Sequence, residues 1–292
     1  MSNHSLIIEE RARDIGGFLV GRLIPFRKKR MVGPFIFIDH MGPAEVKPPK
    51  YMDIGQHPHI GLSTLTYLLE GEMLHKDSLG TEQLITPGAV NWMTAGHGVV
   101  HTELSPEHLK DGRSYRMHGY QIWVALPKDQ EEIDPSFVHV EADKLPQWER
   151  EGVHYKLVAG KGYGKESPVP VFSDLFMVEL KSESEGNVDT CDDLNGEIGI
   201  CVVEGYVIVG EERIEKGNML VSKQRDSCCF TIGENSHVFL FGGEPFAEER
   251  HIYWNFVATS KEKIKAAKER WERRAFPMVE GETSYVPLPK RK

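Results

Sequence analysis

The chain has 292 residues, of which 40% are hydrophobic and 27% are charged, a composition typical of a globular protein with one large domain or two ordinary ones. Its formal net charge of -9 argues against a general nucleic-acid-binding protein, which normally carries a basic excess. No apolar run has the length needed to cross a bilayer, and the first residues lack the basic start and apolar core of a signal peptide.

The cysteines and the one basic run indicate the cellular compartment in which the protein is expected. The four cysteines, Cys191, Cys201, Cys228 and Cys229, lie in the second half of the chain, and nothing in their spacing resembles a disulfide framework. We therefore expect a cytoplasmic protein with no membrane partner and no direct contact with nucleic acid. The run R-K-K-R at residues 27–30 is interpreted as a solvated turn in preference to a localisation signal.

Most of the chain has the pattern of short strands. Runs rich in Val, Ile, Leu, Phe and Tyr, such as residues 35–39, 120–126 and 237–241, are separated by Gly, Pro, Asn and Asp. Many short strands with frequent turn signals indicate a sandwich or a barrel. We therefore predict an all-β fold for most of the chain.

Two pairs of residues at alternate positions are candidate metal ligands. His57 and His59 stand one residue apart in Q-H-P-H, and His101 and Glu103 repeat this spacing in V-V-H-T-E. Residues at i and i+2 of a strand share a face, so each pair is expected to point to one side of its strand. A lone histidine is more often a surface or core residue, but the two pairs together favour a site for a divalent first-row metal.

Three other histidines and two tryptophans are weaker candidates for functional residues. Taken singly, the histidines of the N-terminal half are interpreted as surface or packing residues, and the tryptophans as core residues in preference to stacking platforms for a ligand. The histidines are His75, His108 and His118, and the tryptophans are Trp92 and Trp123.

The chain repeats a pattern of strand, Glu-Gly turn, strand and second glycine turn. The pattern begins with L-L-E-G-E-M at residues 68–73 and again with V-V-E-G-Y-V at residues 202–207, which predicts two similar β-barrels. The acidic, turn-rich stretch at residues 127–135 is the predicted boundary. We therefore predict an N-terminal metal-binding domain over residues 1–132 and a C-terminal metal-free domain over residues 133–292.

The repeat also predicts why only one barrel would hold a metal. Counted from the shared glycines, the positions of the first histidine pair fall on Cys191 and Asp193, and the position of His101 falls on Phe230. The second copy therefore lacks the imidazoles and carries a phenylalanine at the place of a ligand.

One helix is predicted near the C-terminus. Thr259 and Glu262 have the spacing of a capping box, and Pro277 is expected to end the helix. Apolar residues then recur at three- and four-residue intervals and form a single stripe: Ile264, Ala267 and Trp271.

Over nearly its whole length the sequence resembles the pirin family of the cupin superfamily. R-M-V-G-P-F-I-F-I-D-H-M-G-P at residues 30–43 is similar to the opening of that family. H-P-H-I-G-L-S-T-L-T-Y-L-L-E-G-E at residues 57–72 and P-G-A-V-N-W-M-T-A-G-H-G-V-V-H-T-E at residues 87–103 resemble its two metal-bearing motifs. The stretch from residue 242 to residue 260 resembles bacterial-type members.

The resemblance implies a bicupin, in which two jelly-roll β-barrels face each other and the N-terminal barrel holds iron. The family's ligands fall on His57, His59, His101 and Glu103. Some pirins open the flavonol ring with O2 and release carbon monoxide, as quercetin 2,3-dioxygenase does. The implied cofactor is Fe(II), although Cu, Ni, Co, Mn or Zn suits the same ligands. Glu103 would bind the metal and also take the proton of the substrate.

The resemblance leaves two further interpretations open. Animal pirins are described as nuclear co-regulators whose metal redox state alters protein binding, so the chain is alternatively a redox sensor with protein partners. A storage or structural bicupin is the third interpretation. One residue departs from the family pattern: members commonly have arginine where this chain has His97, which we interpret as a turn residue.

Overall fold

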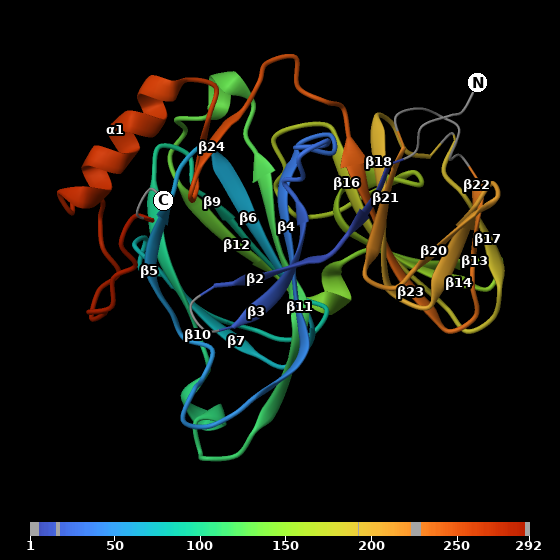
Figure 1. Ribbon diagram of the computed structural model, residues 1–292, viewed down its shortest axis with the longest axis horizontal. Coiled ribbons are helices and arrows are strands. Elements are labelled where there is room, and N and C mark those ends of the chain that lie inside the picture. The colour runs from blue at the N-terminus through green and yellow to red at the C-terminus, as the bar shows by residue number, and fades with distance from the viewer. Residues whose placement is uncertain (1–5, 16–17, 192, 223–228, 290–292) are drawn as a thin grey trace. The chain divides into compact units, whose positions relative to one another are not determined.

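The computed structural model describes residues 6–15, 18–191, 193–222 and 229–289. Most of these residues are in short strands, and α1 (Lys261–Glu272) is the one α-helix among them (Figure 1). The prediction of an all-β fold with a C-terminal helix is confirmed. No helix in the described part of the chain is both long enough and apolar enough to cross a membrane.

The chain divides into two compact units, and neither is one continuous piece of sequence. Unit 1 consists of Met1–Ala12, Gly21–Asp39 and Val140–Phe246. Unit 2 consists of Arg13–Val20, His40–His139 and Ala247–Lys292. The first residues therefore belong with the second half of the chain, and the last residues belong with the first half. The division at residues 132 and 133 stays a prediction about sequence-contiguous domains.

Unit 2 contains a four-stranded sheet with the order β5-β10-β7-β8. Its strands are β5 (Ile54–His59), β10 (Val99–Leu104), β7 (Met73–Asp77) and β8 (Glu82–Ile85). A two-stranded sheet contains β24 (His251–Tyr253) and β25 (Phe256–Ala258). The short 3-10 helices η1 (Glu107–Leu109) and η2 (Lys128–Gln130) lie in connections.

A seven-stranded sheet has the order β12-β9-β6-β11-β4-β3-β2. Its strands are β12 (Ser136–Val140), β9 (Val90–Thr94), β6 (Leu62–Glu70), β11 (Tyr115–Ala125), β4 (Phe35–Val46), β3 (Leu19–Ile24) and β2 (Arg11–Asp14).

Unit 1 contains an eight-stranded sheet with the order β1-β21-β18-β23-β16-β14-β13, and β15 also pairs with β14. Its strands are β1 (Leu6–Glu9), β21 (Asn218–Ser222), β18 (Glu197–Glu204), β23 (Ser236–Gly243), β16 (Leu175–Ser182), β14 (Val153–Gly162), β13 (Gln147–Arg150) and β15 (Lys165–Glu166). A four-stranded sheet has the order β17-β22-β19-β20, and η3 (Ala142–Lys144) precedes β13. Its strands are β17 (Gly186–Asp189), β22 (Cys229–Ile232), β19 (Tyr206–Val209) and β20 (Glu212–Glu215).

The two four-stranded sheets repeat one topology. In chain order β17, β19, β20 and β22 take the places that β5, β7, β8 and β10 take in unit 2, and the sheet orders match. The predicted internal repeat is confirmed by this match. The residue count from the glycines is nevertheless wrong for Cys191 and Asp193, which follow the end of β17. Residues 190–196 connect β17 to β18, whereas only residues 60 and 61 connect β5 to β6, so the shared offset does not hold.

The interior of unit 1 is filled by apolar side chains. Phe230 of β22 pairs with Val188 of β17, and both are buried in the hydrophobic core. Val207 of β19 pairs with Ile232 of β22 in the same core. Burial of side chains of this size stabilises the folded state by about 1.5–3 kcal/mol each.

Helix α1 begins at a different cap from the one predicted. The Ser260 hydroxyl accepts hydrogen bonds from the backbone N–H groups of Glu262 and Lys263, so Ser260 is the N-cap. Thr259 is engaged elsewhere, because its N–H and hydroxyl both donate to the buried Glu131 carboxylate, at 2.7 and 3.1 Å. The predicted apolar stripe of Ile264, Ala267 and Trp271 is buried, as expected.

Candidate metal centre

The register of β5 and β10 brings three histidines together. His101 is directly opposite His57 across the ladder, and Val99 is opposite His59. Because cross-strand partners share a face, as do residues at i and i+2, all three imidazoles point to one side of this sheet. All three are buried, and one ligand nitrogen from each lies within 4.8 Å of the others.

Glu103 is on the same face but stands outside this group. Along β10 the pairing with β7 is regular and puts Glu103 opposite His75. On the other side a bulge intervenes, and Glu103 pairs with Ile54. The carboxylate is buried, its Oε1 has no hydrogen-bond partner, and it is not among the ligand atoms that lie within 4.8 Å of one another. Burial raises the pKa of Glu103 to about 7.

The ring nitrogens of the three histidines are arranged as metal ligands require. His57 donates its Nδ1 proton to the Gly55 carbonyl at 2.8 Å, which leaves Nε2 as a lone-pair donor. The ring nitrogens of His59 and the Nε2 of His101 are buried and have no hydrogen-bond partner. An orphaned buried polar atom costs about 1–3 kcal/mol. Coordination of a metal ion would satisfy these nitrogens, so the three residues fit such an ion.

Burial also keeps these imidazoles in the form that binds metals. It lowers the pKa of His57 to about 4, and it lowers the pKa of His59 and of His101 well below the usual value. Each histidine is therefore neutral at pH 7. Neutral imidazole is the form that binds a metal, so binding would not have to displace a proton from these rings at that pH.

His75 and Asp77 of β7 extend the polar group, although the sequence alone favours a surface or packing role for His75. His75 is buried, its Nδ1 lies 3.4 Å from Nδ1 of His101, and its ring stacks on Phe137. Its Nε2 lies 3.0 Å from Oδ2 of Asp77. Burial raises the pKa of Asp77, but the hydrogen bonds from His75 and from the Thr81 and Leu79 backbones outweigh it and lower the pKa. The signal in the sequence was H-K-D, the same i, i+2 spacing that identified the ligand pairs.

A C-terminal strap, residues 279–286, covers the edge of β5. The buried amide of Gln56 donates to the carbonyls of Glu282 and Ser284 and accepts from the Val279 N–H. The Gln56 backbone N–H donates to the Ser284 hydroxyl, and its carbonyl accepts from the Val286 N–H. In Figure 1 the C-terminal segment runs beside β5. The strap therefore fixes the residue next to His57 on a strand that is otherwise at a sheet edge.

The remaining sequence candidates lie outside the three-histidine group. His97 is in an exposed turn, where its Nε2 is 3.3 Å from Oδ1 of Asp134, so the turn interpretation is confirmed. His108 is exposed and pairs with Glu72. His118 packs against His40 with 2.8 Å between the two Nε2 atoms.

The two tryptophans are core residues, as expected. Trp92 is buried and donates its Nε1–H to the Thr94 hydroxyl. Trp123 is also buried, and its ring meets the His59 ring edge to face with 5.0 Å between centroids. Trp123 therefore forms part of the wall around the histidine group.

The cysteines differ from expectation in one respect. Cys201 and Cys229 are not in disulfides, whereas Cys191 is disulfide-bonded, which the cysteine spacing did not indicate. Cys228 lies outside the described residues.

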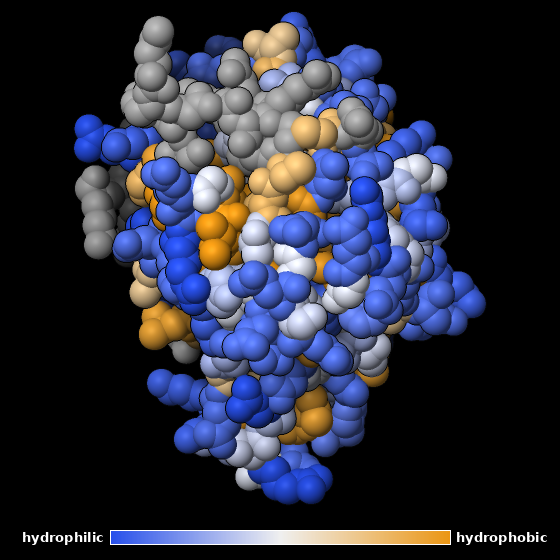
Figure 2. Space-filling view, turned by 90° about the vertical axis from the view of Figure 1, so that its right-hand side faces the viewer, coloured by the Kyte–Doolittle hydropathy of each residue, from blue (hydrophilic) through white to orange (hydrophobic). Residues whose placement is uncertain are grey.

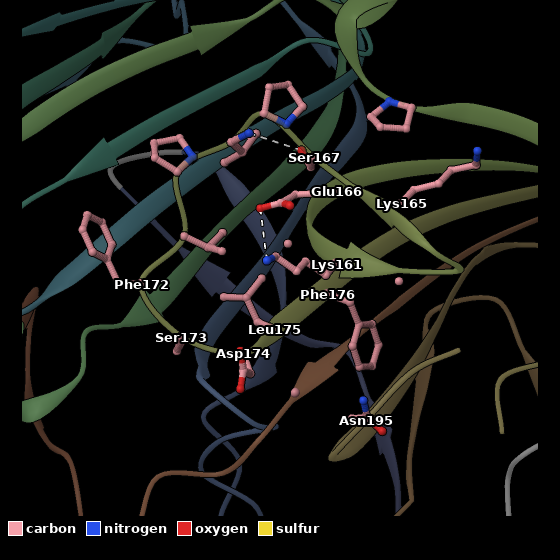
Figure 3. A pocket seen from close by; sticks show the side chains of 18 of the residues that line it. Lys161, Lys165, Glu166, Ser167, Phe172, Ser173, Asp174, Leu175, Phe176 and Asn195 are labelled. Atoms are coloured by element: carbon pink, nitrogen blue, oxygen red, sulfur yellow. Dashed lines mark hydrogen bonds and ion pairs between the residues drawn. The ribbon is translucent and has the colours of Figure 1, made fainter. Parts of the chain in front are cut away.

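A groove of about 1220 Å³ lies in unit 1, beside the turn between β14 and β15. Figure 3 shows two of its lining residues, Lys161 and Glu166, paired with each other, and both side chains are exposed. Its lining includes none of the four predicted ligands. Figure 2 shows that hydrophilic residues dominate the face of the molecule drawn there, with small hydrophobic patches between them. The groove has mixed charge and no histidine, so the metal centre of unit 2 is the stronger candidate site.

Comparisons with known proteins identify relatives that match almost the whole chain. The family model Pirin matches residues 17–124, and the model for the Pirin C-terminal cupin domain matches residues 177–277. A pirin-like protein of Caulobacter vibrioides is 45% identical over 290 residues, covering 97% of this chain and 99% of that protein.

Solved structures show the same fold. The crystal structure of a quercetin 2,3-dioxygenase from Acinetobacter baumannii is 34% identical, has a TM-score of 0.90, and covers 99% of this chain and 96% of that one. The bacterial pirin YhhW of Escherichia coli, solved in complex with nickel(II), is 19% identical with a TM-score of 0.65, covering 83% of this chain and 100% of that one.

Proposed function

Because the chain belongs to the pirin family of the cupin superfamily, we propose that unit 2 is a metal-dependent dioxygenase that opens a flavonol ring with O2 and releases carbon monoxide. The observation that carries this proposal is the group of three buried, neutral imidazoles whose ligand nitrogens lack other partners. The quercetin 2,3-dioxygenase of similar structure supports the choice of a flavonol as substrate.

His57, His59 and His101 would hold the metal, which we propose is Fe(II). A bound metal of this kind would supply the centre at which a flavonol anion and O2 react. Cu, Ni, Co, Mn and Zn suit the same ligands, so the choice of iron rests on the family. The three imidazoles are buried and the Trp123 ring packs against His59, which would shield a bound substrate from solvent.

Glu103 would take the proton of the flavonol hydroxyl. Its carboxylate is buried beside His101, and Oε1 has no hydrogen-bond partner. A carboxylate next to the reacting centre is a suitable base, and it would keep the proton in a site without water. In the overall reaction both atoms of O2 enter the ring-opened product, and one ring carbon leaves as carbon monoxide with its own oxygen.

The first test is consumption of quercetin with detection of carbon monoxide. Protein is loaded with Fe(II) without air and then given O2, beside His101→Ala protein and beside Fe(II) without protein. We expect turnover well above both controls. Protein that demonstrably holds its iron and still gives no carbon monoxide would rule out the proposed reaction.

The substitution Glu103→Gln tests whether Glu103 acts as a base or as a metal ligand. We expect turnover to fall about 100-fold or more, because general bases contribute that much, while Co(II) affinity changes less than about tenfold. Co(II) affinity is measured by visible absorption. A loss of affinity as large as the loss of turnover would make Glu103 a ligand, as the family resemblance implies, and would contradict a role as base alone.

Three further points stay predictions. A redox-sensing role without turnover, protein partners for that role, and a cytoplasmic location rest on the sequence alone. The sensor interpretation would replace the dioxygenase if iron-loaded protein bound a partner in one oxidation state and consumed no flavonol.

A further inference from the structure

Three side chains in unit 2 form an unbroken line of contacts that ends at a candidate metal ligand. Oδ1 of Asp77 accepts hydrogen bonds from the backbone N–H groups of Leu79 and Thr81, at 2.9 and 3.0 Å. Oδ2 of Asp77 lies 3.0 Å from Nε2 of His75. Nδ1 of His75 lies 3.4 Å from Nδ1 of His101.

When the Asp77 carboxylate is ionised and both imidazoles are neutral, one arrangement of protons satisfies this line. An ionised carboxylate only accepts, so His75 must carry its proton on Nε2 and donate it to Asp77. The Nδ1 of neutral His75 is then a lone pair, which accepts the Nδ1 proton of His101. His101 is left with a lone pair on Nε2, the nitrogen that has no partner in the protein.

We propose that Asp77 and His75 are positioning residues that set the tautomer and the ring orientation of His101 and so hold its Nε2 ready for the metal. This inference rests on the proposed metal site of unit 2. Partners that orient a ligating histidine typically change metal affinity by about 10–100-fold, and a carboxylate behind the histidine also makes the imidazole a better donor.

Unit 1 shows that the fold does not require polar residues at these two positions. β19 takes the place of β7 in the repeated sheet, and Val207 pairs with Ile232 where His75 pairs with Glu103. Val209 follows two residues later, at the place of Asp77, and both valines are buried in the apolar core. The polar pair therefore accompanies the three histidines, since the matching sheet folds with aliphatic side chains in its place.

The substitution Asp77→Asn should reverse the direction of the hydrogen bonds that run from His101 to residue 77. It keeps the turn in which Leu79 and Thr81 donate to Oδ1. Asn keeps Oδ1, which continues to accept from Leu79 and Thr81, and it puts an NH2 group where Oδ2 was. The opposite rotamer is disfavoured, because it would point the NH2 at two backbone N–H donors. The new donor moves the His75 proton to Nδ1, and His101 must then carry its proton on Nε2.

The primary experiment reads the tautomer of His101 in metal-free protein by 15N NMR of the imidazole nitrogens. We expect a protonated Nδ1 in the wild-type protein and a protonated Nε2 in Asp77→Asn. Co(II) titration followed by visible absorption should show affinity about 10–100-fold lower in the variant. Asp111→Asn is the matched control, since Asp111 also caps a turn, through the Arg113 N–H, and contacts no histidine.

A double-mutant cycle tests whether His75 carries the effect. In a His75→Phe background, which keeps a ring to stack on Phe137, Asp77→Asn should change Co(II) affinity less than about twofold. An equal loss in both backgrounds would overturn the proposal, as would an unchanged His101 tautomer in Asp77→Asn. The NMR measurement needs neither metal nor turnover. It therefore tests the role of Asp77 and His75 even if the protein proves not to be a dioxygenase.

Discussion

The two four-stranded sheets of the chain have the same topology, but the paired side chains compared here are polar in unit 2 and apolar in unit 1. In unit 2 the pair of β10 and β5 is His101 with His57, and in unit 1 the pair of β22 and β17 is Phe230 with Val188. The next pair is Glu103 with His75 in unit 2 and Ile232 with Val207 in unit 1. Every polar member of the first set therefore has an apolar counterpart in the second.

The difference shows what each sheet contributes to the molecule. Apolar side chains in the interior of unit 1 each stabilise the fold by about 1.5–3 kcal/mol. The imidazoles of unit 2 have buried nitrogens without partners, and each such group costs about 1–3 kcal/mol until a ligand satisfies it. One copy of the repeat thus stabilises the structure, and the other copy holds a group of donors that a bound ion would satisfy.

The largest effect on stability is expected when an imidazole is placed in the apolar four-stranded sheet of unit 1. Phe230→His should lower the free energy of unfolding by about 4 kcal/mol, from lost ring burial and an unpaired imidazole together. Denaturant unfolding measures this, and Phe230→Leu, which loses volume without adding a polar atom, should cost only about 1–2 kcal/mol. Equal costs for the two variants would mean that the imidazole finds a partner inside unit 1.

The reciprocal exchange places a phenyl ring in the polar sheet. His101→Phe should reduce Co(II) affinity by more than about 100-fold, since even partners behind a ligand contribute 10–100-fold. The free energy of unfolding of metal-free protein should change by less than about 1 kcal/mol, because an orphaned polar atom is removed. Wild-type Co(II) affinity in the folded variant would place the metal elsewhere.

A smaller effect is expected from loosening the strap on β5. Gln56→Met fills a similar volume but leaves the Val279 N–H and two strap carbonyls without partners, which should cost about 2 kcal/mol. Hydrogen exchange of the strap amides should accelerate in step with this loss. Gln83→Met is the control, because the Gln83 amide bonds only the neighbouring Leu84 carbonyl and the residue is half-buried. Unchanged exchange in Gln56→Met would show that the strap is held elsewhere.

The smallest effect is expected at the position where the family commonly has arginine. His97→Arg should change Co(II) affinity and flavonol turnover by less than about twofold, because residue 97 is exposed and its partner Asp134 is fully solvated. A change above tenfold in turnover alone would place residue 97 at the substrate.

Alternation along a strand was enough to find the three histidines, because pairs at i and i+2 must share a face whatever the rest of the fold does. The same rule put Glu103 on the correct face, but it carried no information about the bulge in β5 opposite that residue. His75 and Asp77 show the identical spacing and were missed because His75 was considered alone and not together with Asp77.

Features that depend on loops or distant segments were not predictable. Cys191 and Asp193 were matched to the positions of the first histidine pair because the length of the connection after β17 is not encoded in any glycine pattern. Ser260 replaces Thr259 as the cap because Glu131, far away in sequence, engages the threonine. Gln56 and Ser284 are 228 residues apart, and no local pattern joins them.

The strap also fixes when unit 2, with its candidate metal centre, is completed during synthesis. The ribosome makes the histidine strands early, but the edge of β5 receives its hydrogen bonds only from residues 279–286. Unit 2 as a whole needs Ala247–Lys292, whereas every segment of unit 1 has been made once Phe246 is translated. Contacts so distant in sequence form late in folding. The unit whose histidine strands are translated early is therefore completed after unit 1, and its candidate metal centre is finished only once the strap has been made.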